Sequence, residues 1–157
     1  MIRLLGYRQG LTRFFAQADF LRPGLPVLDA GCGTGAATLV LHTALDERNL
    51  LPARFHAFDL TPLMISRFWK ALDEHPVPGI ELVAANALQL QALSTSWGDY
   101  DVVVSSGMVE FLPKAALPRA LRGLRLRLKA GGSLVVFISR QISFMALVKS
   151  LVQKLSE

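Results

Sequence analysis

Short runs of apolar residues alternate along the chain with longer segments whose apolar residues recur at every third or fourth position. The short runs predict buried strands, and the longer segments predict helices. Strands are expected at 27–28, 53–58, 80–85, 100–106 and 133–138. Helices are expected at 7–21, 35–45, 62–74, 114–129 and 141–155. Ala130-Gly131-Gly132 is expected to end the fourth helix and to turn the chain into the last strand.

The composition adds a constraint on the strands. Hydrophobic residues make up 52% of the 157 residues, and the mean hydropathy is +0.38. Such values suit one domain with a parallel sheet covered on both faces, because its strands are buried on both sides. No segment has the length of a transmembrane helix or a signal peptide. The single cysteine, Cys32, excludes an internal disulfide. We therefore expect a cytoplasmic protein.

The chain carries 17 basic and 12 acidic residues, which gives a net charge of +5. Arg119, Arg122 and Arg125 gather on one face of the helix expected at 114–129, a pattern that would suit nucleic acid or anionic lipid. We interpret this face as the solvated outer side of a helix that covers the sheet. No aromatic residues interleave with these arginines, so nucleic acid is not expected as a partner.

The stretch Val27-Leu28-Asp29-Ala30-Gly31-Cys32-Gly33-Thr34-Gly35 carries the clearest chemistry in the sequence. A strand leads into an acid, then into three glycines at alternate positions, and then into a helix. Glycine permits a tight turn and lets a ligand approach bare backbone, and the amides of the next helix point toward a negatively polarised group. The stretch predicts a nucleotide-type cofactor site. Gly31-x-Gly33-x-x-Ala36 also satisfies the dinucleotide pattern, so a nicotinamide-dependent oxidoreductase is an alternative.

Asp59 ends the second predicted strand. An acid that ends the strand after a glycine loop, about 20 residues on, is well placed to bind a ribose diol. A carboxylate suits this task because it accepts hydrogen bonds from two adjacent hydroxyls. The alternative is that Asp59 only caps the helix that begins at Thr61-Pro62.

The glycine stretch resembles motif I of the class I S-adenosylmethionine-dependent methyltransferases, hydrophobic-hydrophobic-Asp-hydrophobic-Gly-Cys-Gly-Thr-Gly, residue for residue. Asp59-Leu60-Thr61-Pro62, the strand at 100–106 and the passage at 128–136 resemble later family segments in the right order. The resemblance covers roughly residues 25–140 and implies that the cofactor is S-adenosyl-L-methionine.

The resemblance also implies a set of binding residues. Asp29 and the glycines would surround the methionine end, with Asp29 bonded to the cofactor ammonium. Asp59 would bind the ribose and Leu60 would lie against the adenine. Asn86 stands where the family usually has an aspartate. The predicted cofactor-binding residues are Asp29, Ala30, Gly31, Cys32, Gly33, Gly35, Asp59, Leu60, Asn86, Ala87 and Ser105, and no metal site is predicted.

The family fold is a Rossmann-like, doubly wound, mainly parallel α/β sheet of seven strands with helices on both faces. This chain offers about five strands, so we expect one C-terminally short domain over 1–157. It would comprise an N-terminal helical segment at 1–24, a core at 25–140 and a terminal helix at 141–157. Without the final hairpin the sheet edge and the terminal helix would stay uncovered. The chain is then either a truncated form or completed by a homodimer or a partner chain.

The function implied is methyl transfer to a small-molecule acceptor, because the sequence contains no separate recognition domain. The reaction is an in-line displacement, so the protein mainly aligns the acceptor and excludes water. Glu110 is the candidate general base, with hydrogen-bonding support as the alternative. In the family a helix like that at 7–21 often covers the cofactor, yet packing and exposure are the preferred interpretation for Tyr7 and Arg8. A non-catalytic cofactor-binding subunit is the main alternative function.

Overall fold

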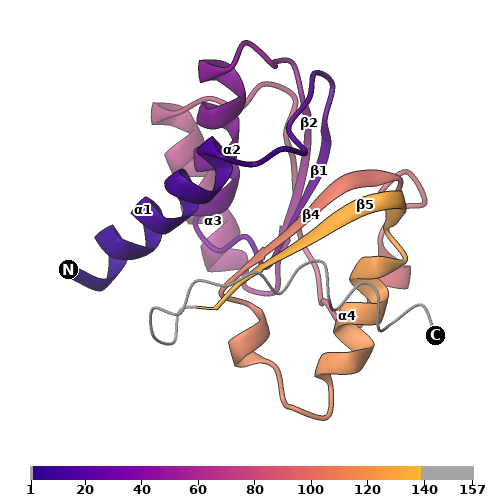
Figure 1. Cartoon of the computed structure of the whole chain (residues 1–157). Coiled ribbons are helices and arrows are strands. Elements are labelled where there is room, and N and C mark those ends of the chain that lie inside the picture. Colours follow the sequence, from indigo (N-terminus) through magenta and orange to yellow (C-terminus); the bar gives the residue numbers. More distant parts are fainter. Residues whose placement is uncertain (1, 139–157) are drawn as a thin grey trace.

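A computed structural model describes the backbone of residues 2–138 and the side chains of residues 7–138. Within this part of the chain, five parallel strands form one sheet in the order β3-β2-β1-β4-β5 (Figure 1). The strands are β1 (Pro26–Ala30), β2 (Arg54–Asp59), β3 (Glu81–Ala84), β4 (Tyr100–Ser106) and β5 (Leu128–Phe137). The helices are α1 (Ile2–Ala16), α2 (Ala36–Glu47), α3 (Pro62–Glu74) and α4 (Leu117–Arg125), with 3-10 turns η1 (Leu90–Ala92) and η2 (Val109–Phe111). The expected doubly wound, Rossmann-like α/β fold is confirmed.

The central strands are buried on both faces of the sheet. Val27 of β1 packs into a core with α1, α2 and α3, whereas the next residue, Leu28, packs into a second core with α4 and η1. Val102 and Val103 of β4 divide in the same way. Because side chains alternate across a strand, a continuous apolar run fills both cores. The high hydrophobic content therefore reflects a sheet that is covered twice.

The strand order reverses between β1 and β4. From β1 the chain passes to β2 and β3 on one side, and it then crosses to β4 and β5 on the other. The connections that leave β1 and β4 diverge at this point. Ligands of open α/β sheets bind in the resulting crevice, at the carboxyl ends of the strands. The topology therefore predicts that a ligand site includes the turn after β1.

The first helix ends earlier than its apolar pattern predicts, at Ala16 and not near residue 21. The apolar positions that continue the pattern, Ala18 and Leu21, are buried in an irregular segment. The side chain of Arg48 donates a hydrogen bond to the Ala18 carbonyl at 2.8 Å. The pattern therefore predicts correctly that Ala18 and Leu21 are buried. Their segment is not helical, and the Ala18 carbonyl bonds to Arg48 at the end of α2.

The fourth helix and the fifth strand also differ from the prediction. The helix ends at Arg125, and β5 already begins at Leu128, paired with Tyr100. The glycines predicted to form a turn instead form an irregularity within the strand, where Gly131 has φ +79°. A Cβ on Gly132 would lie 2.9 Å from the Tyr100 carbonyl oxygen. Glycine at these positions therefore lets β5 bulge and pass close to β4.

The terminal helix expected at 141–157 lies outside the described residues. In the described part of the chain, none of the helices has the length and apolar character needed to cross a membrane.

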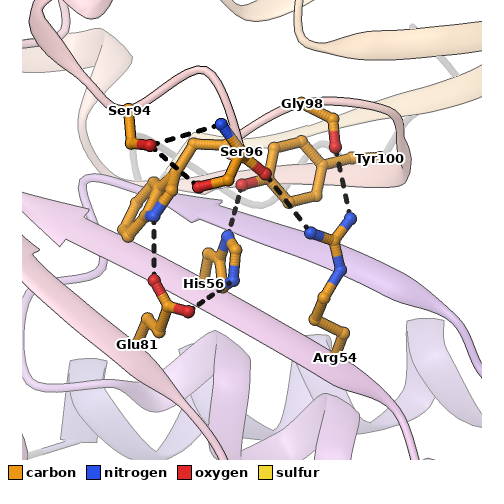
Figure 2. Close-up of polar contacts among 8 residues, drawn as sticks. Arg54, His56, Glu81, Ser94, Ser96, Gly98 and Tyr100 are labelled. Carbon is orange, nitrogen blue, oxygen red and sulfur yellow. Dashed lines mark hydrogen bonds and ion pairs between the residues drawn. The ribbon is translucent and has the colours of Figure 1, made fainter.

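A polar network joins three strands on the α4 face of the sheet (Figure 2). The buried His56 of β2 shares a 2.7 Å hydrogen bond between its Nδ1 and the Tyr100 hydroxyl of β4. Its Nε2 lies 3.5 Å from Oε1 of Glu81 in β3. The Trp97 indole donates to the other oxygen of Glu81 at 3.0 Å and stacks on the His56 ring. Burial lowers the pKa of His56, so the ring is neutral at pH 7.

Candidate functional site

The turn after β1 is fixed to the end of β2 by its backbone amides. The amides of Gly31 and Cys32 both donate to the Phe58 carbonyl at 2.9 Å. The Gly33 amide donates to Oδ2 of Asp59 at 3.0 Å. The Gly35 amide closes the turn on the Cys32 carbonyl at 2.9 Å. The turn predicted to bind the cofactor is therefore in direct contact with Asp59, the residue predicted to bind the ribose.

Two glycines of this turn are needed for different reasons. Gly35 has φ +88°, and a Cβ there would lie 2.0 Å from the ring of Phe68, a fully buried residue of α3. Gly33 has φ +54°, but a Cβ there would meet nothing within 4 Å. Gly35 allows α2 and α3 to pack closely, whereas Gly33 presents bare backbone to open space. A ligand can approach the turn at Gly33.

The segment after β4 closes the other side of the turn. A Cβ on Gly31 would lie 2.4 Å from Cβ of Met108. Glu110 follows in η2, and a Cβ on Gly107 would lie 3.9 Å from its Oε1. The carboxyl ends of β1 and β4, which flank the reversal in strand order, thus meet through Gly31 and Met108.

Asp29 is buried beneath the turn, with an exposed fraction of 1%. Its Oδ2 accepts hydrogen bonds from the amide and the hydroxyl of Thr38, at 3.2 and 2.7 Å. Its Oδ1 is buried and has no hydrogen-bond partner among the described residues. Burial raises the pKa of Asp29 to about 6, against hydrogen bonds from Thr38 that lower it and with a smaller rise from Asp59. The carboxylate is half-paired and suits a cationic donor.

Ionisation of Asp29 is expected to destabilise the chain in the absence of a ligand. The folded-state pKa of about 6 exceeds the unfolded value of 3.8, so stability falls as pH rises between these values and stays lower above them. Asp29→Asn cannot ionise. Its stability advantage over wild type is expected to grow by about 2.4 kcal/mol between pH 4 and pH 7, measured by urea unfolding. Asp73→Asn, at an exposed position of α3, is the control for lost charge. If the difference in unfolding free energy between Asp29→Asn and wild type does not change with pH, ionisation of Asp29 does not destabilise the folded chain.

Asp59 already accepts two hydrogen bonds in this structure. Besides the Gly33 amide at Oδ2, the Thr61 amide donates to its Oδ1 at 2.9 Å, at the start of α3. The N-cap residue of α3 is Thr61, and the helix has no side-chain cap hydrogen bond, so Asp59 bonds the amide of the N-cap residue itself. A carboxylate offers about four lone-pair positions, so two remain for a ribose diol. Leu60, the next residue, is 67% exposed and can cover an apolar ring.

Asn86 lies beside Asp59, because the amide of Ala85 donates to the Asp59 carbonyl at 2.9 Å. Oδ1 of Asn86 accepts from the Leu88 amide at 2.9 Å. The Ala87 side chain, in contrast, packs into the α4-side core. The side chain of Asn86 therefore lies outside the core that Ala87 enters, beside the end of β2, and Ala87 has only its backbone to offer a ligand.

Three other predicted site residues, Ala30, Cys32 and Ser105, are buried at the ends of β1 and β4 or within the turn itself. Ala30 belongs to the α4-side core, and Cys32 to the core on the opposite face. Burial raises the pKa of the Cys32 thiol, with Asp29 and Asp59 adding to the rise, so the thiol is neutral and unsuited to nucleophilic chemistry. The Ser105 side chain is fully buried. Ala30 and Cys32 can contact a cofactor only through their backbone.

The structure separates Tyr7 and Arg8, the two α1 residues for which the sequence favoured packing and exposure over a place near the site. Arg8 lines a hollow of about 280 Å³ together with His42 and Thr43 of α2 and Glu74 of α3. Tyr7 instead lies within electrostatic reach of Asp29 and Glu110, which both raise its pKa. The amphipathic pattern of α1 could indicate that Tyr7 is buried, but not what faces its hydroxyl. In the described residues, no group of three or more potential ligands could bind a metal ion.

Comparison with known proteins points to one family. Residues 27–132 match a family described as a methyltransferase domain. The chain is 30% identical over 126 residues to a carboxy-S-adenosyl-L-methionine synthase of Salmonella paratyphi B; the match covers 80% of this chain and 47% of that protein. The chain thus spans about half the length of the curated relatives it matches.

Solved structures share the fold at lower identity. A glycopeptide N-methyltransferase, MtfA, complexed with S-adenosyl-L-methionine is 20% identical with a TM-score of 0.62, over 83% of this chain and 53% of that one. A coclaurine N-methyltransferase bound to N-methylheliamine and SAH is 17% identical with a TM-score of 0.63, over 82% of this chain and 35% of that one. At these identities the likeness establishes the fold alone.

Proposed function

Because this chain belongs to the methyltransferase domain family, we propose that it transfers the methyl group of S-adenosyl-L-methionine to a small-molecule acceptor. The cofactor follows from the family, in agreement with the sequence expectation. The acceptor class and the transfer itself are the proposed part. Support for a small acceptor comes from the coclaurine N-methyltransferase, whose structure contains N-methylheliamine. It also comes from the sequence of α4, where no aromatic residues interleave with Arg119, Arg122 and Arg125 as a base-stacking surface would require.

This proposal rests on the turn after β1, which lies where the strand order reverses. The turn is open at Gly33, and the Asp29 carboxylate beneath it has one oxygen, Oδ1, that is buried without a partner among the described residues. Asp59 retains lone pairs for two hydroxyls, and Leu60 is exposed beside it. A ligand could satisfy these groups with an ammonium at Asp29, a ribose at Asp59 and an aromatic ring at Leu60. The residues present therefore fit S-adenosyl-L-methionine.

When bound, S-adenosyl-L-methionine supplies a methyl group on a positively charged sulfur together with its own leaving group. The task of the chain is then to bind and orient. Asp29 accepts from the ammonium, Asp59 accepts from the ribose hydroxyls, and Asn86 exchanges hydrogen bonds with the adenine edge. Met108 lies against the turn from the β4 side and excludes water there.

Glu110 has the role of proton acceptor in this proposal. It lies in η2, directly beyond the carboxyl end of β4, and its charge acts on the Tyr7 hydroxyl. A carboxylate at this position can take the proton that an oxygen or nitrogen acceptor loses on methylation. Hydrogen-bonding support of the acceptor is the other role that the same position allows.

Calorimetric titration of the 157-residue chain with S-adenosylhomocysteine (SAH) tests the cofactor half of the proposal. Binding with a Kd in the micromolar range is expected, because the turn, Asp29 and Asp59 are already arranged. NAD(H) is the control ligand, since the glycine spacing also satisfies the dinucleotide pattern. A folded chain that binds NAD(H) and not SAH would overturn the proposal. Binding of SAH without transfer to any acceptor would favour a cofactor-binding subunit.

A further inference from the structure

The hydrogen bonds that cross three strands at His56 have one consistent direction when the ring is neutral (Figure 2). Nε2 of His56 lies 3.5 Å from Oε1 of Glu81, and an ionised carboxylate can only accept, so the ring proton lies on Nε2. Nδ1 is then an acceptor, and the Tyr100 hydroxyl donates to it at 2.7 Å. The Trp97 indole donates to Oε2 of Glu81 at 3.0 Å. Tyr100, His56, Glu81 and Trp97 therefore form one chain of satisfied groups, which we call the β3 clamp.

The β3 clamp matters because β3 has little packing of its own. The strand has four residues, none of them buried, and it pairs with β2 alone among the described strands. Leu82 and Val83 are only partly buried against the two cores. His56 and Trp97, in contrast, are 4% and 3% exposed. Glu81 bonds to both of these buried side chains, so it anchors an edge strand that few apolar contacts hold.

The far end of β3 lies beside the candidate site. The register places Glu81 opposite His56 and Ala84 opposite Asp59. Three residues, about 10 Å of extended strand, separate Glu81 from Ala84. The next amide along the chain donates to the Asp59 carbonyl at 2.9 Å, and Asn86 follows it. A movement of β3 relative to β2 therefore displaces Asn86 relative to Asp59.

A second proton on the His56 ring is incompatible with this arrangement. Among the described residues, the ionisable groups that face the ring are Glu81 of β3, Tyr100 of β4 and Arg54 of β2. Burial lowers the pKa of His56, with Glu81 opposing this effect and Arg54 adding to it. The Glu81 side chain is 60% exposed, so solvent screens its attraction for a charged ring.

The Tyr100 hydroxyl adds a second cost to protonation. Burial raises the pKa of Tyr100, so the hydroxyl keeps its proton. A protonated Nδ1 is a donor, and the fully buried Tyr100 hydroxyl then loses the acceptor of its own proton. The charged His56 ring is therefore more stable when β3 has moved and water reaches the ring.

We propose that His56 is a positioning residue that holds β3 in register only while its ring is neutral, so that protonation loosens β3 and weakens binding of the adenine end of the cofactor through Asn86. The last step rests on the proposed function, whereas the loosening of β3 does not. Cofactor affinity then decreases in acid by a route that is separate from the ionisation of Asp29.

Trp97 reports the state of the β3 clamp directly. Its indole stacks on the His56 ring at 4.6 Å between centroids, and an imidazolium at such a distance quenches tryptophan emission. The chain has two tryptophans, so Trp69→Phe, at an exposed position of α3, leaves Trp97 as the only one. Its emission is expected to titrate with a midpoint below pH 6.5, the ordinary pKa of histidine.

Two histidine variants in the Trp69→Phe background are the controls for this titration. His56→Gln is expected to abolish the transition in emission. His75→Gln, which removes an exposed histidine at the end of α3, is expected to leave the transition unchanged. A transition that persists in His56→Gln, or a wild-type emission that does not change with pH, would overturn the role of His56.

His56→Gln is also the matched variant for binding, because its amide oxygen can accept from Tyr100 and its N–H can donate to Glu81 without titrating. Calorimetry with SAH is expected to give equal affinities for wild type and His56→Gln at pH 8. One pH unit below the fluorescence midpoint, wild type is expected to bind SAH about threefold to tenfold more weakly than His56→Gln. Only about one-tenth of the wild-type chains then have a neutral ring. Protonation of Asp29 affects both proteins alike and cancels in this ratio.

The Asn86→Ala background tests the route from the β3 clamp to the cofactor. If the loss in acid acts through Asn86, the ratio of SAH affinities between His56→Gln and wild type is expected to fall to about one in this background. A ratio that stays at its original value would overturn the route through Asn86, and equal affinities of wild type and His56→Gln in acid would overturn the positioning role. A chain that is folded at pH 8 and binds no SAH would instead overturn the proposed function. The emission of Trp97 would still test the β3 clamp in that case.

Discussion

Asp59→Ala is expected to weaken SAH binding at least a hundredfold while the chain remains folded. The carboxylate accepts the Gly33 and Thr61 amides at 3.0 and 2.9 Å. It thereby fixes the turn after β1 to the end of β2 and also faces the ribose position. Removing it eliminates two ribose contacts to a charged group, each with a typical contribution of about 1.5–3 kcal/mol, and releases the turn. Calorimetry with SAH measures the loss.

Asp59→Asn separates the two roles of this residue. The amide retains one acceptor oxygen and has the same shape, so it can still accept from one of the two backbone amides. We expect SAH affinity between those of wild type and Asp59→Ala, and a urea midpoint closer to wild type. If Asp59 only capped α3, both variants would lose stability and bind SAH as tightly as wild type. Unchanged affinity in a folded Asp59→Ala variant would contradict the ribose role.

Most of the fold could be predicted from the sequence because the central strands are buried on both faces of the sheet. A continuous apolar run such as 102–104 fits a central strand that is covered on both faces, and a small α/β domain has few other positions that would bury such a run. The glycines at alternate positions predicted the turn, since positive φ at Gly33 and Gly35 follows directly from their spacing between a strand and a helix. Local patterns of this kind determine where elements occur. They also determine which strand ends carry polar residues.

The errors occurred where tertiary contacts overrode local pattern. Ala18 continues the apolar spacing of α1, but its carbonyl is bonded to the side chain of Arg48 and the helix has already ended. Gly131 and Gly132 were predicted to form a turn, and they instead let β5 pair with Tyr100 before the bulge. Neither partner is near in sequence, so neither contact is visible in a window of residues.

The candidate site shows the same division. The sequence identified Asp29 and Asp59 from their positions at strand ends, and the structure places both on one turn. It did not indicate that the side chain of Ala87 packs into the core or that the Tyr7 hydroxyl lacks a partner. Both depend on which element covers which face. Burial of a particular atom is a property of the assembled layers.

The second large effect is expected for Gly35→Ala, which should destabilise the chain by about 3–5 kcal/mol. Alanine at φ +88° is strained by about 1–2 kcal/mol, and its Cβ would lie 2.0 Å from the buried Phe68 ring. Either the ring or the start of α2 must move, and both belong to the core. Gly33→Ala is the matched control, since φ is also positive but the space is open. Its expected cost is about 1–2 kcal/mol, measured by urea unfolding.

Phe68→Leu separates the steric part of this effect from the backbone strain. Leucine is smaller than the ring, so Gly35→Ala should cost less in a Phe68→Leu background than in wild type. A double-mutant cycle is expected to give a favourable coupling of about 1–3 kcal/mol between the two changes. The remaining cost should match that of Gly33→Ala, because strain at positive φ is common to both. Additive effects of Gly35→Ala and Phe68→Leu would mean that contact with the ring is not the cause. In that case the requirement for glycine at residue 35 would be conformational alone.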